Sequence, residues 1–184
     1  MTHRRVASSW RCSAIRILSA TAVLGGLPGL GLAQSSVGHW VSLGPSGGIV
    51  LALAVDPRTP STVYAGGLAT GVFKSVDGGE SWAFSGIAGA RVSALTLDSS
   101  PTSVLYAGTN QGVFRSSDGG ATWMQASAGL SSTAVFAIVV DPQTPATVYA
   151  ATFAGIFKST DGATSWVSMS GGLGAQPVHA LAID

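Results

Sequence analysis

The sequence has a single cysteine, Cys12, and charged residues make up only 9% of its 184 positions. A single cysteine excludes a framework of intramolecular disulfides. No segment after residue 33 sustains the 3.6-residue apolar period of an amphipathic helix, and glycine is frequent, at 25 of 184 residues. Together these features exclude a helical bundle and predict an all-β fold.

Acidic residues are absent from the first 33 positions, which hold four of the nine Lys and Arg. An apolar stretch over residues 17–32 follows, with small residues Gly31 and Ala33 just before Gln34. This order predicts a signal peptide at 1–33, cleaved after Ala33, and an exported protein that is periplasmic or extracellular. A retained membrane anchor is disfavoured because glycine and proline interrupt a segment at the short limit for spanning a bilayer. Both general and twin-arginine export stay open.

Residues 34–184 carry five Lys and Arg against eight Asp and Glu, a formal net charge of about −3. The basic residues are single and widely spaced, so no basic stripe is available for phosphates, and no nucleic-acid partner is expected. Cys12 leaves with the signal peptide, which removes thiol chemistry from the mature chain. Export without cysteine is typical of a bacterial protein.

One phrase occurs three times: SVDGGESW ending at Trp82, SSDGGATW ending at Trp123 and STDGATSW ending at Trp166. A repeat of about 40 residues predicts a β-propeller with one four-stranded antiparallel blade per repeat. We expect the propeller domain over 34–184, in the N-terminal part of a longer protein. Its incomplete arc has full blades at about 49–88, 91–129 and 134–172, and a lone strand at each end, at 40–43 and 178–184.

The repeated phrase resembles the Asp-box, or BNR, repeat S-x-D-x-G-x-T-W of sialidases, sortilin-like receptors and xyloglucanase-type propellers. The third copy departs from it at Ala163, which replaces glycine, and at Ser165, which replaces threonine. The resemblance implies that the boxes are architectural turns away from any active site. The corresponding positions are Ser75, Asp77, Gly79, Trp82, Ser116, Asp118, Gly120, Trp123, Ser159, Asp161 and Trp166.

Each box predicts a tight turn between the third and fourth strands, because glycine accepts positive φ and the carboxylate accepts backbone N–H groups. The tryptophan is expected to cover the space between adjacent sheets. In an up-and-down meander the loops after strands one and three share a rim, so the boxes join the DP-x-x-P turns at 56–60 and 141–145 there. The loops that vary between repeats share the opposite rim, where we expect recognition.

The candidate ligand residues on that variable rim are polar or aromatic. They are Phe84, Arg91, Asn110, Gln111, Phe153 and His179. His179 belongs to a variable column of the first strands, expected near the central opening. The other members of this column are Leu51, Ser93 and Phe136.

No catalytic residue, cofactor or metal site is expected. A glycosidase needs two carboxyl groups facing one sugar bond, but seven of the eight acids occupy repeated turn positions and Glu80 lies inside a box. One carboxylate per turn is too few oxygen ligands for calcium. The sequence therefore predicts a non-catalytic scaffold for a protein or carbohydrate ligand. The alternative is a piece of a xyloglucanase- or sialidase-like glycoside hydrolase whose catalytic residues lie outside this chain.

An open arc is also expected to self-associate, because its end blades lack neighbours. The apolar columns expected on an uncovered face include Val135, Ile138 and Val140. Burial of such surface drives association.

Overall fold

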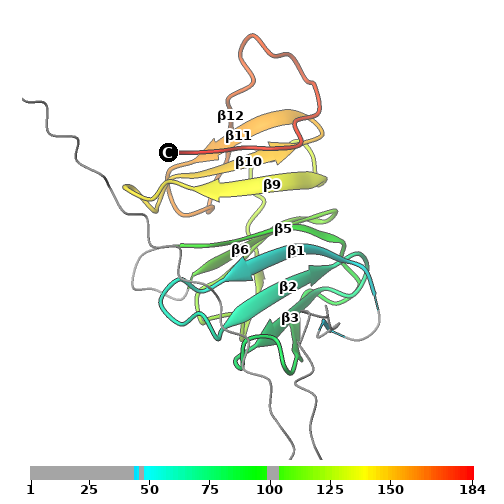
Figure 1. Cartoon of the computed structure of the whole chain (residues 1–184). Helices are drawn as coiled ribbons and strands as arrows, with labels where there is room; N and C mark the ends of the chain where they lie inside the picture. Colours follow the sequence, from blue (N-terminus) through cyan, green and yellow to red (C-terminus); the bar gives the residue numbers. More distant parts are fainter. Residues whose placement is uncertain (1–43, 46–47, 99–103) are drawn as a thin grey trace, which may run out of the picture. The chain divides into compact units, whose positions relative to one another are not determined.

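The computed structural model describes residues 44–45, 48–98 and 104–184 (Figure 1). Every regular element in this part of the chain is a β-strand, and the twelve strands form three four-stranded antiparallel sheets. The predicted all-β fold is confirmed. The predicted signal peptide at 1–33 and the predicted strand at 40–43 lie outside the described residues. Within those residues there is no helix with the length and apolarity needed to cross a membrane.

Strand order in each sheet follows the chain, as in a meander. The first sheet contains β1 (Val50–Val55), β2 (Val63–Gly67), β3 (Val72–Ser75) and β4 (Ala83–Gly86). The second contains β5 (Val92–Leu97), β6 (Leu105–Thr109), β7 (Gly112–Ser116) and β8 (Met124–Gln125). The third contains β9 (Val135–Val140), β10 (Val148–Thr152), β11 (Gly155–Ser159) and β12 (Val167–Ser168).

Adjacent sheets meet at their first strands, because β5 contacts both β1 and β9. Two glycines in the second strands permit this approach. A Cβ on Gly66 would lie 2.6 Å from Cγ1 of Val92, and a Cβ on Gly108 would lie 2.8 Å from Cγ1 of Val135. Because real side chains do not approach so closely, any larger residue would push the next sheet away.

The hydrophobic core is divided between the two joints that link adjacent sheets. The first joint buries Tyr64, Val72, Val92, Leu105 and Ala107. The second is larger, and its buried members include Tyr106, Val113, Val135, Ile138, Phe157 and Trp166. Each sheet is therefore stabilised by packing against its neighbours, since a single four-stranded sheet has no core of its own.

The expected position of the uncovered apolar surface was wrong. Val135 and Ile138 are only 1% and 5% exposed, because this face of β9 packs on the second sheet. The corresponding face of β1 is open instead, with Leu53 64% and Val55 50% exposed. In each first strand this face points to the preceding sheet, and among the described residues β1 has none before it.

A β-bulge recurs near the start of every first strand. In β1 the pairing passes from Val50 to Ala52, which leaves Leu51 without a partner in the ladder. In β5 and β9 the same irregularity leaves out Ser93 and Phe136. Since a bulge redirects the extra side chain and increases the local twist, the variable column is displayed differently from its neighbours.

Candidate functional site

The three turns at residues 75–82, 116–123 and 159–166, called the Asp turns below, share one hydrogen-bond pattern. In the second turn, the Asp118 carboxylate accepts the hydroxyl of Ser116 at 2.8 Å and the backbone N–H of Thr122 at 2.9 Å. The Ser116 hydroxyl oxygen accepts the N–H of Gly120 at 2.9 Å. Asp77 and Asp161 repeat these contacts. The aspartate thus closes the turn on itself.

These bonds also fix the charge of the turns. The side-chain hydroxyl of Thr122 is the largest cause that lowers the pKa of Asp118 to about 2, and that of Ser165 similarly lowers the pKa of Asp161 to about 2. The hydroxyl of Ser81 lowers the pKa of Asp77 as well. A carboxylate held this way stays ionised at neutral pH and cannot act as a general acid there.

The Asp turn of the second sheet is bound directly by the first sheet. Tyr64 donates its hydroxyl to the Gly119 carbonyl at 2.9 Å, and Lys74 donates its Nζ to the same oxygen at 2.8 Å. Ser85 donates its hydroxyl to the neighbouring Gly120 carbonyl at 2.6 Å. The Lys74 Nζ also lies 5.4 Å from the centre of the Tyr64 ring, in a cation–π contact. We call Tyr64 and Lys74 a donor pair, because both donate to the Gly119 carbonyl.

The joint between the second and third sheets uses other contacts. Trp166, 4% exposed, donates its indole N–H to the Ala126 carbonyl at 2.8 Å and its backbone N–H to the Ala128 carbonyl at 2.9 Å. Arg115 takes the place of Lys74 and lines a hollow of about 240 Å3 that also contains Met124. In the described part of the chain, Arg115 Nε and Trp123 Nε1 are buried without a hydrogen-bond partner.

The Asp turns and the loops after the first strands share one rim. The N–H of Gly78 donates to the Ser61 carbonyl at 2.8 Å, and the N–H of Gly162 donates to that of Ala146 at 2.9 Å. In the loops themselves, Asp56 and Asp141 accept backbone N–H groups two and three residues ahead. We call this the constant rim.

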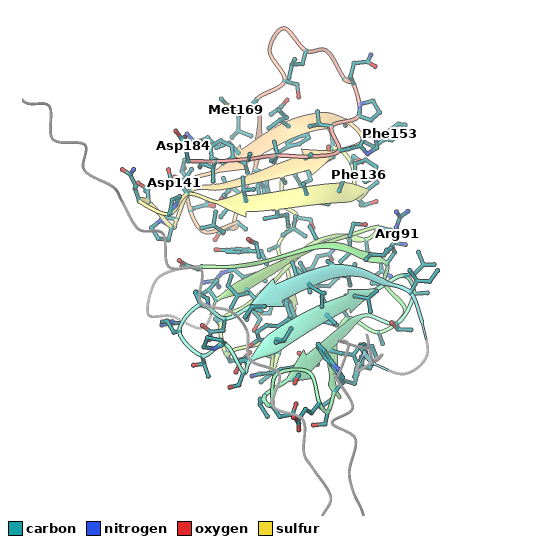
Figure 2. The ribbon with its side chains drawn as sticks, in the orientation of Figure 1. Arg91, Phe136, Asp141, Phe153, Met169 and Asp184 are labelled. Atoms are coloured by element: carbon teal, nitrogen blue, oxygen red, sulfur yellow. The ribbon has the colours of Figure 1, made fainter. Side chains whose placement is uncertain are left out.

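The loops that differ between repeats meet at the other ends of the strands. The residue after each second strand donates its N–H to the chain just before a first strand: Leu68 to Ile49, Asn110 to Arg91 and Phe153 to Ala134. Arg91, Phe136 and Phe153 project at this end, whereas Asp141 projects at the opposite one (Figure 2). We call this end the variable rim.

No family model matches the chain, and no curated protein matches it. Several solved structures do. The GH74 enzyme of Niastella koreensis is 27% identical with a TM-score of 0.56, over 65% of this chain and 22% of that one. The GH74 xyloglucanase of Xanthomonas campestris is 19% identical with a TM-score of 0.55, over 66% and 23%. YCF48 bound to the D1 peptide is 16% identical with a TM-score of 0.53, over 67% and 41%.

The three sheets are blades of a β-propeller. Four-stranded meanders in strand order 1-2-3-4, joined side by side at their first strands, have this architecture. The chain spans about a fifth of the length of the GH74 enzymes that it matches. The blades themselves are thus shared with these enzymes, while activity is a separate question.

The structure brings together some of the predicted ligand residues. Asn110 and Arg91 are joined twice, because the Asn110 side-chain oxygen accepts the Arg91 N–H at 3.0 Å and the Asn110 N–H donates back at 3.2 Å. The His179 ring lies 4.5 Å from that of Phe136, centre to centre. Phe153 is 60% exposed on the same rim. The Gln111 carbonyl accepts the side-chain amide of Gln125 at 3.0 Å.

Phe84 lies elsewhere. It belongs to the outer strand β4, packs edge-to-face on Phe73 with ring centres 5.7 Å apart, and borders a hollow shared with the Asp turn of the next blade. It was expected on the variable rim, but β4 continues to Gly86 and includes Phe84. Residues missed on that rim are Ile49 and Leu68, 61% and 41% exposed. Their signal was available, since they share repeat positions with Arg91 and Asn110.

The described residues of the variable rim contain no cluster of metal-ligating side chains. Within the described ranges 48–98 and 104–184, no group of three or more His, Cys, Asp or Glu side chains is placed to hold a metal ion. In the described part of the chain this rim offers the exposed side chains of Phe153, Ile49 and Leu68. It also offers the guanidinium of Arg91 and the amides of Asn110 and Gln111. This chemistry suits recognition of a neutral polar ligand by stacking and hydrogen bonding.

Proposed function

We propose that this protein is an exported, non-catalytic propeller scaffold that binds a protein or carbohydrate ligand at the variable rim. The observation that carries the proposal is the recurring bulge, which displays Leu51, Ser93 and Phe136 beside the variable loops of all three blades. Bulges are frequent next to binding sites because they redirect a side chain. Export is inferred from the residues before Gln34.

A structural role for the acids supports the absence of catalysis. Asp77, Asp118 and Asp161 are held inside their own turns, where each carboxylate accepts the hydroxyl of the serine two residues before it. Asp56 and Asp141 close neighbouring turns on the same constant rim. A glycosidase needs one acid free to donate a proton and a second facing it across the sugar. The variable rim is supplied instead with Arg91, Asn110 and aromatic side chains.

Two ligand classes are consistent with this surface. Among the similar structures are a propeller bound to a peptide and several GH74 enzymes, one of them a xyloglucanase. We would measure binding of xyloglucan oligosaccharides by calorimetry and screen a displayed peptide library against the full chain. Arg91→Ala and Phe153→Ala should each weaken binding of the selected probe about tenfold. Met124→Ala, 74% exposed on β8, is the matched control and should bind normally.

The second candidate is a glycoside hydrolase of GH74 type, which the 27% identity to the Niastella koreensis enzyme favours. Its catalytic acids would then lie outside this chain. Reducing-end release from xyloglucan by the 184-residue chain would overturn the non-catalytic proposal. Equal loss of binding in the Met124→Ala variant would place the ligand away from the variable rim.

A further inference from the structure

Residues 178–184 cover the face of the third blade on which the first strand of a further blade would pack. The Val178 N–H donates to the Thr152 carbonyl at 3.0 Å, and His179 contacts Phe136. Leu181 and Ile183 then border an apolar hollow of about 290 Å3 together with Val139, Tyr149, Ile156 and Met169. Figure 1 shows this carboxyl-terminal segment, in red, running along the third sheet. Residues 178–184 have no strand assignment.

The sequence of this segment is nearly that of β1. Residues 178–184 read VHALAID and residues 50–56 read VLALAVD, with five of the seven positions identical. Val135 and Ile138 show how such a strand packs, since they are buried against the preceding blade. In β1 the equivalent Val50 and Leu53 are 37% and 64% exposed. The molecule thus exposes a second strand that fits the face held by 178–184.

The polar contacts between the first and second blades also have counterparts at the two ends of the three-blade unit. The Lys158 Nζ lies 5.4 Å from the centre of the Tyr149 ring, the same distance as between Lys74 and Tyr64. The Lys74 and Tyr64 pair binds the carbonyl of Gly119, which is buried. Its counterpart in the first Asp turn, Gly78, is exposed. One end of the three-blade unit therefore has a donor pair, and the other end has a matching turn.

We propose that the first blade of a second copy docks on the third blade, displacing residues 178–184 and placing its Gly78 carbonyl against Tyr149 and Lys158. The contact is head-to-tail, between two different faces, and it repeats the packing already found between the first and second blades. Residues 178–184 compete for the same face. In each copy these residues therefore limit association with a second copy.

Two leucines at equivalent repeat positions test this competition, with opposite expected effects. In the full chain, Leu53→Asp should lower the association constant about 100-fold, because the incoming strand loses its apolar contact. Leu181→Asp should raise it at least several-fold, because the internal competitor is weakened. Met124→Asp, an exposed residue of the middle blade, should leave it unchanged. Sedimentation velocity over micromolar concentrations measures all four proteins, after circular dichroism has verified their fold.

A mixing experiment tests the head-to-tail geometry. Leu53→Asp removes one face and Lys158→Glu removes the other, so each variant alone should be monomeric. An equimolar mixture should form a dimer, because each variant supplies the face that the other lacks. No dimer in the mixture would overturn the geometry. A drop in association for Leu181→Asp, or a monomeric wild type and monomeric Leu181→Asp variant throughout the range, would overturn the proposal itself.

Discussion

Ala163 packs beside Ala126 in the joint between the second and third blades, at the positions that Gly120 and Ser85 hold in the preceding joint. A Cβ on Gly120 would lie 2.8 Å from the Ser85 hydroxyl oxygen. Ala163 has φ of 70°, close to the 85° of Gly120, and its methyl group is buried. Ala126, which is smaller than Ser85, therefore makes room for the methyl group of Ala163, which is larger than Gly120.

This relationship predicts that Gly120→Ala destabilises the protein by about 1–3 kcal/mol, from a left-handed φ and a steric clash. Adding Ser85→Ala should recover part of that loss, because the clashing hydroxyl is removed. Urea unfolding of the two single variants and the double variant gives the coupling free energy. Strictly additive losses would show that Ser85 is not the obstacle.

Trp166→Ala should lower the free energy of unfolding by about 3–5 kcal/mol, because it removes a buried aromatic side chain from the larger core cluster. The substitution also removes the indole N–H that donates to the Ala126 carbonyl. Trp82 is the internal comparison, since it is only half-buried and bonds to Gly79 of its own turn. Chemical denaturation should show a smaller loss for Trp82→Ala. Equal losses would mean that the turn, and not the joint, requires the tryptophan.

Tyr64→Phe removes the hydroxyl that donates to the Gly119 carbonyl, and we expect a loss of about 1 kcal/mol. The loss is limited because Lys74 still donates to that oxygen. Tyr149→Phe is the matched control, because no blade follows the third one in the described part of the chain to supply a carbonyl. Thermal and urea unfolding at low protein concentration should leave the control at the wild-type midpoint.

Acid should weaken the Asp turns. Their hydrogen bonds lower the folded-state pKa of Asp118 and Asp161 to about 2, below the value of about 3.9 for a free aspartate. Their contribution is therefore complete above about pH 4 and is lost as the pH falls toward 2. Urea midpoints measured at pH 6, 4, 3 and 2 should fall mainly between pH 4 and pH 2. Asp118→Asn should reduce this slope, and an unchanged slope would assign the acid sensitivity to other groups.

The repeat period was sufficient to predict the sheets, because one strand pattern occurs three times and each copy corrects the others. Three repeats predicted four-stranded antiparallel blades, and the described residues form three four-stranded antiparallel sheets. The burial of Val135 and Ile138 could not be obtained this way, because period-2 alternation identifies a face without saying which neighbour covers it. Phe84 was misplaced for a related reason, since the end of a short outer strand leaves almost no mark in the sequence.

The bulges have a consequence for protein engineering. Leu51, Ser93 and Phe136 are the positions of the first strands that pair with no residue across the ladder. Side chains there can be exchanged without loss of a cross-strand partner, whereas the flanking Val92 and Val135 are buried at the joints. A combinatorial library confined to these three positions would diversify one surface and leave every paired residue of the first strands unchanged.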